Sequence, residues 1–208
     1  MPRSKGSSHR WCQRQTRDPY VERAVEGGWR SRAAFKLIEI NSRERILKRG
    51  AVVVDLGAAP GGWSQVAASL VGTEGRVLAI DRLPMDPIEG VEFLQADLLD
   101  EEGLRWLHER VGERAVDLVM SDMAPNISGN RAIDQPRSLA LVEVAVMFAR
   151  EVLKPGGSML IKLFQGEGQR ELELELKREF ERLRRVKPKA SRAESREIYV
   201  LACNYRMV

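Results

Sequence analysis

The fold of this chain can be anticipated from a single stretch, which reads VVVDLGAAPGGW and covers residues 52–63. It starts with a short apolar run, typical of a buried strand, and passes through closely spaced glycines into an amphipathic segment. Glycine suits such a turn because it adopts backbone angles that other residues avoid and lets a ligand approach the main chain. The stretch therefore predicts a strand, a tight turn and a helix that form one wall of a ligand site.

Short apolar runs and longer amphipathic stretches alternate on both sides of this turn. Strands are predicted at residues 51–56, 76–80, 91–94, 115–120, 158–164 and 197–203. Helices are predicted near residues 19–26, 31–45, 63–70, 101–111, 137–153 and 169–183. Because strands that alternate with helices form parallel βαβ units, we predict an α/β fold: a doubly wound, mostly parallel sheet of Rossmann-like type, with helices on both faces.

Composition divides the chain into an arm and one larger domain. Residues 1–18 are polar and cationic, which predicts a flexible N-terminal arm. The remaining residues 19–208 are enough for one packed domain, with N-terminal helices in 19–49 and an α/β core in 50–208.

Several classes of protein are disfavoured by the same composition. No stretch reaches the roughly 18 uncharged apolar residues that span a bilayer, and from the polar residues 1–11 we expect no secretory signal. The two cysteines and two histidines show no metal-ligand spacing, so we expect no metal. We expect a cytoplasmic monomer with reduced cysteines and no membrane contact.

Charge is unevenly distributed along the chain, whose net charge is +4. Residues 1–50 hold 13 Lys and Arg against 5 Asp and Glu, whereas residues 51–165 hold 10 against 17. Because clustered cations gain free energy by releasing counterions from nucleic acid, a basic arm on an acidic body predicts RNA binding. We assign this role to Lys5, Arg10 and Arg14, although a basic tail that serves only solubility would have the same composition.

Three acidic residues surround the glycine-rich turn. Asp55 directly precedes it, Asp81 ends the next strand, and Asp97 follows the third. These positions suit an ammonium group, ribose hydroxyls and an adenine amino group, respectively. Ala59 replaces the second glycine of the G-x-G-x-x-G pattern, which weakens a pyrophosphate clamp and favours adenosylmethionine over a nicotinamide cofactor. Each acid taken alone is equally consistent with a helix cap or a surface charge.

The turn is also predicted to contact the cofactor directly. We assign Gly57, Gly61, Gly62 and Trp63 to this role, because a strand-to-helix turn brings main-chain donors to a ligand. A second glycine turn, LKPGGS at residues 153–158, stands before a predicted strand, as is common in methyltransferase domains.

Polar residues emerge at the ends of later strands, where doubly wound sheets bind their ligands. Asp122 follows one strand, Glu197 opens the last, and Lys162 interrupts the otherwise apolar run 159–164. A lysine in such a run is costly to bury without carboxylate partners, unless its ammonium reaches solvent at the strand end. A centre that methylates a hydroxyl must hold the oxygen in line with the methyl group and accept its proton, and such a cluster suits that work.

With these residues in place, the sequence as a whole resembles a known family, the FtsJ/RrmJ-type ribosomal RNA large-subunit 2′-O-ribose methyltransferases. The resemblance rests on motifs in the order of that family and extends over most of the chain. They read RSRAAFKL at 30–37, VDLGAAPGGWSQ at 54–65, MSDMAPN at 120–126, KLFQGEG at 162–168 and SRAESRE at 191–197.

The resemblance implies that Lys36, Asp122, Lys162 and Glu197 form a catalytic tetrad in which Lys162 accepts the proton. It also implies contacts with S-adenosyl-L-methionine at Gly61, Trp63, Asp81, Asp97 and Asp122. The substrate that it implies is a uridine in the A loop of 23S ribosomal RNA, within the large ribosomal subunit.

The residues alone leave the role of Lys162 open. Two carboxylates beside it would keep its ammonium protonated, whereas Lys36, a sulfonium and burial would favour loss of the proton. Lys162 could instead orient the 2′-oxygen while the proton leaves through Asp122 or water.

Arg32 lies four residues before Lys36 and shares its helical face. Like charges on one helical face repel unless an anion lies between or beside them. We therefore interpret Arg32 as a phosphate contact and Lys36 as part of the reaction centre. A solvated cationic face is the alternative.

Three other functions compete with this interpretation. Methyltransferases that act on a base amino group carry an aromatic residue after the fourth strand, and the segment DMAPN at 122–126 has none. A cap-type or other RNA 2′-O-methyltransferase would share the tetrad. A ribosome-assembly factor that binds RNA, with catalysis secondary, would share the fold.

Overall fold

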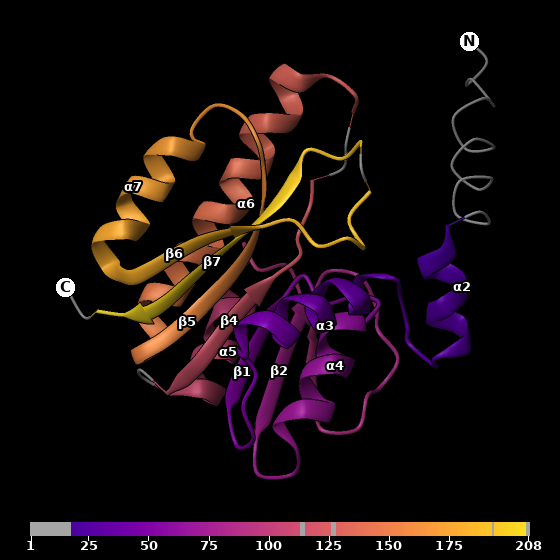
Figure 1. Ribbon diagram of the computed structural model, residues 1–208. Helices are drawn as coiled ribbons and strands as arrows, with labels where there is room; N and C mark the ends of the chain where they lie inside the picture. Colours follow the sequence, from indigo (N-terminus) through magenta and orange to yellow (C-terminus); the bar gives the residue numbers. More distant parts are fainter. Residues whose placement is uncertain (1–17, 113–114, 126–127, 193, 207–208) are drawn as a thin grey trace.

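The computed structural model describes the chain except for residues 1–17, 113–114, 126–127, 193 and 207–208 (Figure 1). Its helices are α2 (Pro19–Glu26), α3 (Ala33–Glu44), α4 (Gly62–Val71), α5 (Glu101–Val111), α6 (Arg131–Val152) and α7 (Gln169–Glu179). Its strands are β1 (Val52–Leu56), β2 (Arg76–Asp81), β3 (Val91–Gln95), β4 (Val116–Ser121), β5 (Leu153–Phe164), β6 (Phe180–Val186) and β7 (Glu197–Tyr205).

The strands form one sheet in the order β3-β2-β1-β4-β5-β7-β6 (Figure 1). The pairs from β3 to β5 are parallel, whereas β7 runs antiparallel between β5 and β6. The chain leaves β1 towards β2 and β3 and later returns to β4 on the other side of β1. The order therefore reverses between β1 and β4, and doubly wound sheets bind their ligands at the carboxyl ends of the strands at such a point. The predicted α/β class is confirmed.

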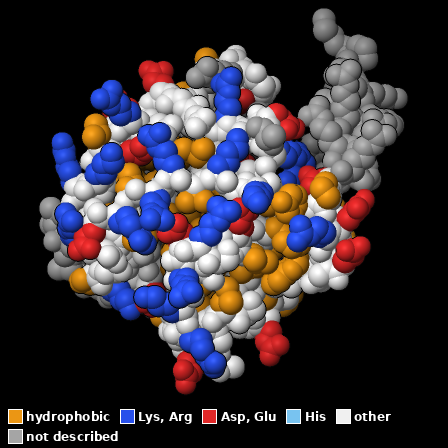
Figure 2. All heavy atoms as spheres, in the orientation of Figure 1, with side chains coloured by type: hydrophobic (Ala, Val, Ile, Leu, Met, Phe, Trp, Pro, Cys, Tyr) orange, Lys and Arg blue, Asp and Glu red, His pale blue; other side chains and the backbone are white. Residues whose placement is uncertain are grey.

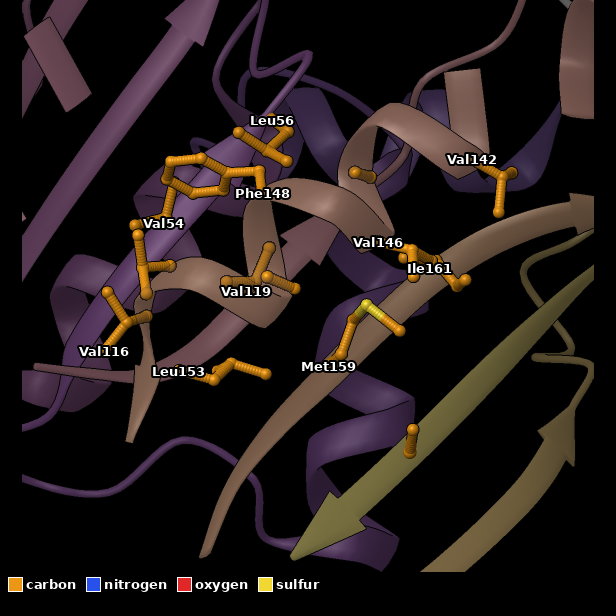
Figure 3. Packing of buried hydrophobic residues seen from close by; sticks show 14 of the residues in the cluster. Val54, Leu56, Val116, Val119, Val142, Val146, Phe148, Leu153, Met159 and Ile161 are labelled. Atoms are coloured by element: carbon orange, nitrogen blue, oxygen red, sulfur yellow. The ribbon is translucent and has the colours of Figure 1, made fainter. Parts of the chain in front are cut away.

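Two hydrophobic clusters cover the opposite faces of the sheet. One collects side chains of α5, α6 and α7, among them Phe148, which lies close to Val54 and Leu56 of β1 (Figure 3). The other collects side chains of α3 and α4. From Ile198 to Cys203, the residues of β7 alternate between the clusters, because successive side chains of a strand point to opposite faces. The face on which a strand residue lies is therefore fixed by its place in this alternation.

Helix α3 docks on the sheet through Ala34, Leu37 and Ile40, which have no exposed surface. Their spacing of three residues places them on one helical face. Lys36 lies beside this face and is itself buried. The apolar contact therefore fixes the place of the lysine.

One strand was not predicted. Helix α7 ends at Glu179, and β6 follows at once, where the sequence pattern predicted a helix to residue 183. Leu172, Leu176 and Phe180 recur every four residues, so the helical spacing continues past the true end of the helix. Strand β6 is also an edge strand with several exposed arginines, and such strands lack the apolar alternation of central ones.

The division into an arm and a single domain stays a prediction, because residues 1–17 lie outside the described residues. Within the described part of the chain, no helix combines the length and apolarity needed to cross a membrane.

We expect Leu37→Ala to lower the free energy of unfolding by about 2–5 kcal/mol, because the substitution leaves a cavity between α3 and the sheet. Denaturant unfolding of the variant and the parent measures the difference. Val25→Ala on α2 is the matched control, since 77% of Val25 is exposed, and it should change stability by less than about 0.5 kcal/mol. A loss below about 1 kcal/mol for Leu37→Ala would show that α3 is not held by this contact.

Candidate active site

The alternation of β5 decides where Lys162 points. Leu160 belongs to the cluster under α3 and α4, and Lys162 is two residues further along the strand. It therefore lies on the same face, beyond the end of that cluster. Tyr199 of β7 is its direct neighbour across the antiparallel pair. Lys162 is buried in this position and does not reach out to solvent.

The structure brings the four predicted tetrad residues together from four elements. Lys36 Nζ lies 2.8 Å from Glu197 Oε1 and 3.9 Å from Asp122 Oδ1. Lys162 Nζ lies 2.9 Å from the same Asp122 oxygen and donates to the Asp122 main-chain carbonyl. Two ammonium groups thus face two carboxylates, so the cluster has no net charge when all four groups are ionised.

Asp122 stays ionised in this cluster. Burial raises the pKa of its carboxyl group, but the charges of Lys162 and Lys36 and a hydrogen bond from Tyr199 outweigh burial and hold the pKa below its ordinary value. At neutral pH, Asp122 can therefore accept hydrogen bonds and stabilise positive charge, but it carries no proton to donate.

Tyr199 is a member of the cluster that the sequence patterns did not reveal. Its hydroxyl donates to Asp122 Oδ1 at 2.6 Å and accepts from Lys36 Nζ at 2.9 Å. Burial and the charges of Asp122 and Glu197 raise the pKa of this phenol well above its ordinary value, so it remains neutral. One signal was present in the sequence: Tyr199 stands two residues after Glu197 in a strand, which places both side chains on one face.

A pocket of about 610 Å³ opens beside the cluster, at the point where the strand order reverses. Its volume lies in the range of small-molecule sites, roughly 300–1,000 Å³. Of the predicted cofactor residues, Gly57, Asp81, Asp97 and Asp122 line it. Asp122 also contacts both lysines, so the pocket and the charged cluster share this residue.

The two acids at the pocket are oriented by the main chain. Asp81 Oδ2 accepts from Ala59 N at 2.9 Å, and its Oδ1 accepts from Leu83 N at 2.8 Å. Asp97 Oδ1 accepts from Leu99 N at 3.0 Å. Each oxygen keeps a further lone pair, so Asp81 can accept from two neighbouring hydroxyl groups and Asp97 from an amino group. The exposed side chains of Leu83 and Leu99 lie in the same lining and offer apolar contact to a flat ring.

Gly57 has a positive φ of 78°. A Cβ atom there would lie 2.2 Å from Met123 Cγ, so only glycine lets the segment after β4 approach the turn this closely.

Gly61, Gly62 and Trp63 do not line the pocket. Gly61 faces the side chains of the loop between β2 and β3, and Gly62 faces Ser31. The Trp63 ring is buried against Tyr199, with centroids 5.6 Å apart, and its Nε1 donates to the Ala33 carbonyl. Any cofactor contact by Trp63 would therefore use its main chain, and the roles of these three residues stay predictions.

Asp55 is buried beneath α4 rather than in the pocket lining. Its Oδ2 accepts from Ser64 Oγ at 2.6 Å, whereas its Oδ1 has no hydrogen-bond partner among the described residues. Burial, partly offset by the Ser64 hydrogen bond, raises the pKa of Asp55 to about 7. A carboxyl group of this kind is largely neutral below that pH, so its predicted contact with an ammonium group stays a prediction.

Arg32 is held by the protein itself. Its guanidinium group forms an ion pair with Asp18 and donates to the main-chain carbonyl of Ala190. Arg192 Nε also lies 3.6 Å from Asp18 Oδ2. Arg32 therefore joins α2, α3 and the loop before β7, which does not favour its use as a phosphate contact. The other predicted RNA contacts, Lys5, Arg10 and Arg14, lie outside the described residues.

Together, the fold and the site define a transferase class: a doubly wound sheet with a nucleoside-sized pocket at its switch point and a lysine–carboxylate cluster beside it. The described part of the chain holds no group of three or more His, Cys, Asp and Glu side chains that could bind a metal ion.

The chain belongs to the FtsJ-like methyltransferase family, whose family model matches residues 29–205. It is similar to a ribosomal RNA methyltransferase of Plasmodium falciparum, with 29% identity and a TM-score of 0.75 over 85% of this chain and 98% of that one. It also shares its fold with an rRNA methylase of Clostridium thermocellum, with 20% identity and a TM-score of 0.53 over 81% of this chain and 96% of that one. The predicted family is confirmed, and the protein is a methyltransferase.

We expect Asp55→Asn to stabilise the protein increasingly as pH rises from 4 to 7. The folded protein keeps a proton on Asp55 up to about pH 7, whereas the unfolded chain releases it near the ordinary pKa of 3.8. The unfolded state is therefore favoured progressively across this interval, by on the order of 4 kcal/mol in total, and asparagine removes the effect.

Denaturant unfolding between pH 4 and pH 8 measures this difference between variant and parent. Asp86→Asn removes the same charge from an exposed side chain and is the matched control. A difference between Asp55→Asn and its parent that does not change with pH would mean that Asp55 is ionised in the folded protein.

Proposed function

We propose that this protein methylates a ribose 2′-hydroxyl of ribosomal RNA with S-adenosyl-L-methionine, and that its target is a uridine in the A loop of 23S ribosomal RNA. The observation that carries the proposal is the assembly of Lys36, Asp122, Lys162 and Glu197 into one cluster beside the pocket. The family match and the similarity to a ribosomal RNA methyltransferase support the same reaction.

The residues that line the pocket fit this cofactor. FtsJ-like methyltransferases generally use S-adenosylmethionine. Asp81 and Asp97 would hold its ribose and adenine, because their carboxylates are oriented by main-chain N–H groups and keep free lone pairs. Leu83 and Leu99 would contact the adenine ring. When bound, the cofactor supplies a methyl group carried on a sulfonium ion.

The charged cluster would act on the target ribose. A 2′-hydroxyl is a weak nucleophile, so the site must place its oxygen precisely and stabilise the charge that develops on it. The Lys162 ammonium suits this task because Asp122 anchors it from two atoms, the side-chain oxygen and the main-chain carbonyl. Lys36 is held in turn by Glu197 and Tyr199, and it fixes the orientation of that side of the cluster.

The proton of the hydroxyl needs an acceptor within the same group. Tyr199 is unsuited, because its raised pKa keeps the phenol protonated and its hydrogen is already donated to Asp122. Asp122 is ionised but has a lowered pKa, which makes it a weak base. We assign the contact with the 2′-oxygen to Lys162. The proton then goes to Lys162 if its amine is neutral when the hydroxyl binds. If Lys162 is an ammonium, it passes one of its own protons to Asp122 as it takes up the hydroxyl proton, or the proton leaves to water.

Mapping the methylated nucleotide tests the proposal. The protein should transfer labelled methyl from S-adenosylmethionine to 23S ribosomal RNA that lacks the modification, and the label should lie on a single A-loop ribose. Free RNA and assembled large subunits serve as parallel substrates, and a capped messenger RNA is the control. Label on a base, on the cap, or on neither ribosomal substrate would contradict the assignment.

We expect Lys162→Ala to slow methyl transfer by about 10²–10⁴-fold while leaving cofactor affinity nearly unchanged, because Lys162 acts on the hydroxyl and does not line the pocket. Single-turnover methylation at saturating RNA and cofactor measures the chemical step alone. Lys177→Ala, which removes an exposed lysine from α7, is the matched control.

A rate within a few-fold of the parent would exclude both roles of Lys162. If the slow rate recovers as pH rises, solvent hydroxide replaces a missing base, and Lys162 is the proton acceptor. A slow rate that does not respond to pH assigns it to orientation of the oxygen.

A further inference from the structure

A second basic segment lies next to the charged cluster, at the opposite end of the chain from the basic arm. Residues 180–197, which form β6 and the loop up to Glu197, contain seven Lys and Arg against three Asp and Glu. The sequence patterns predicted part of this segment as a helix. Its formation as an edge strand determines where the arginines point.

Register divides the arginines of β6 between the two faces of the sheet. Arg182 and Arg184 pair with β7 residues of the cluster under α3 and α4, so they lie on the α3 side. Arg185, the residue after Arg184, points to the opposite face and lies on the α7 side, where its Nε donates to Glu173 Oε1 at 2.7 Å. Two arginines of the edge strand therefore stand beside α3.

Both of these arginines contact one buried carboxylate, that of Glu44. Arg184 Nη1 lies 2.8 Å from Glu44 Oε1 and Arg182 Nη2 lies 3.9 Å from Glu44 Oε2. Their side chains are 53% and 50% exposed, whereas that of Glu44 is 8% exposed. The positive groups therefore face solvent while the negative group that anchors them lies beneath.

The same arrangement recurs one turn earlier on α3. Glu39 accepts from Arg43 at 2.8 Å and from the main-chain N–H of Lys189 at 2.7 Å. Arg43 is half exposed and Lys189 is exposed, whereas Glu39 is largely covered. We call Arg43, Arg182, Arg184 and Lys189 the α3/β6 basic face. Figure 2 shows Lys and Arg side chains gathered over α3 and the β6 edge of the sheet.

This face starts at the charged cluster. Arg43 is seven residues after Lys36 on α3, which places it two turns along the same helical side, about 10 Å away. Lys189 lies in the loop that ends at Glu197. The elements that carry Lys36 and Glu197 of the cluster therefore continue directly into the α3/β6 basic face, which extends away from the cluster.

We propose that the α3/β6 basic face binds the sugar-phosphate backbone of RNA to one side of the target nucleotide, a role that rests on the proposed function. Guanidinium groups bind phosphate oxygens with two parallel hydrogen bonds, and their binding releases counterions. Such contacts position an RNA without reading its sequence. An anionic membrane could use the same cations, but continuity with the charged cluster favours the RNA.

The experiment compares two double variants of the full chain with equal charge change. Arg182→Gln/Arg184→Gln removes two cations of the face. Arg105→Gln/Arg178→Gln removes two exposed arginines from α5 and α7, which cover the other face of the sheet, and is the matched control. The probes are an A-loop hairpin of 23S ribosomal RNA and an unrelated hairpin of equal length, each titrated at several salt concentrations.

We expect Arg182→Gln/Arg184→Gln to weaken binding of both hairpins by about tenfold at 0.1 M salt and to reduce the salt slope by roughly one to two. The KM for RNA should rise by the same factor, while kcat at saturating RNA and cofactor affinity stay unchanged. The matched control should behave as the parent.

Two further variants separate this role from folding. Glu44→Gln/Arg182→Gln/Arg184→Gln removes the carboxylate that the double variant leaves without its partners, so it should fold and still bind RNA weakly. Arg182→Lys/Arg184→Lys keeps both charges and should retain most of the salt slope.

Parent-like affinity and salt slope in the folded double or triple variant would overturn the proposal, as would an equal loss in the matched control. Binding of anionic vesicles that is lost in the variants while RNA binding is unchanged would assign the face to a membrane instead. If RNA binding falls as expected but the parent methylates no ribosomal RNA, the surface stands and the proposed function fails.

Discussion

Two lysines are buried at the carboxyl ends of the central strands, and the rest of the site depends on how their charge is compensated. Lys36 comes from a helix and Lys162 from a strand, and both are excluded from solvent. Glu197 and Asp122 supply the opposite charges at 2.8 Å and 2.9 Å. Removing one member of a buried pair leaves an uncompensated charge, which typically costs about 3–5 kcal/mol. The four residues therefore constrain α3, β4, β5 and β7 to meet at one place.

Tyr199 completes this compensation without adding charge. Its hydroxyl lies between Lys36 and Asp122, donating to the carboxylate and accepting from the ammonium. Burial and two nearby carboxylates raise its pKa, so the bridge persists as a neutral phenol. A neutral bridge lets two cations and two anions share a small volume with their hydrogen-bonding groups satisfied, which is the condition for a stable buried polar network.

The sheet separates the site into two sides, which meet at the carboxyl ends of its central strands. The pocket is lined by residues of α6 and of the segments after β1, β2, β3 and β4, whereas the charged cluster lies on the side of α3. Asp122 belongs to both, because it follows the central strand β4. Under the proposed function, the cofactor and the RNA approach from different sides and meet at this residue. Helix α3 carries Lys36 in its first turn and, further along, Glu39 and Glu44, which anchor the α3/β6 basic face. One rigid element therefore relates the reaction centre to the surface proposed for RNA.

Sequence patterns predicted most of the elements, because a strand or a helix leaves its period in the residues it buries. They failed at β6, where Leu172, Leu176 and Phe180 keep a helical spacing past the last turn of α7. An edge strand that exposes arginines gives no alternation to oppose that spacing. They also could not show that Arg32 pairs with Asp18, because this contact joins segments whose proximity no local pattern reports, and its role in phosphate binding stays a prediction.

The sequence by itself determined the α/β class and the glycine turn, and the family resemblance predicted Lys36, Asp122, Lys162 and Glu197 as a tetrad. The class and the turn leave local marks, an apolar period and a glycine where the backbone must turn sharply, and Lys162 is marked by its place in an apolar strand. Only the tertiary structure decided that Tyr199 bridges the cluster, that Asp55 is buried outside the pocket lining, and that Arg182 and Arg184 stand beside α3. These facts depend on strand register and on the side of the sheet that each helix covers. Both are set by contacts between residues far apart in the chain, and a shift of one residue would reverse them.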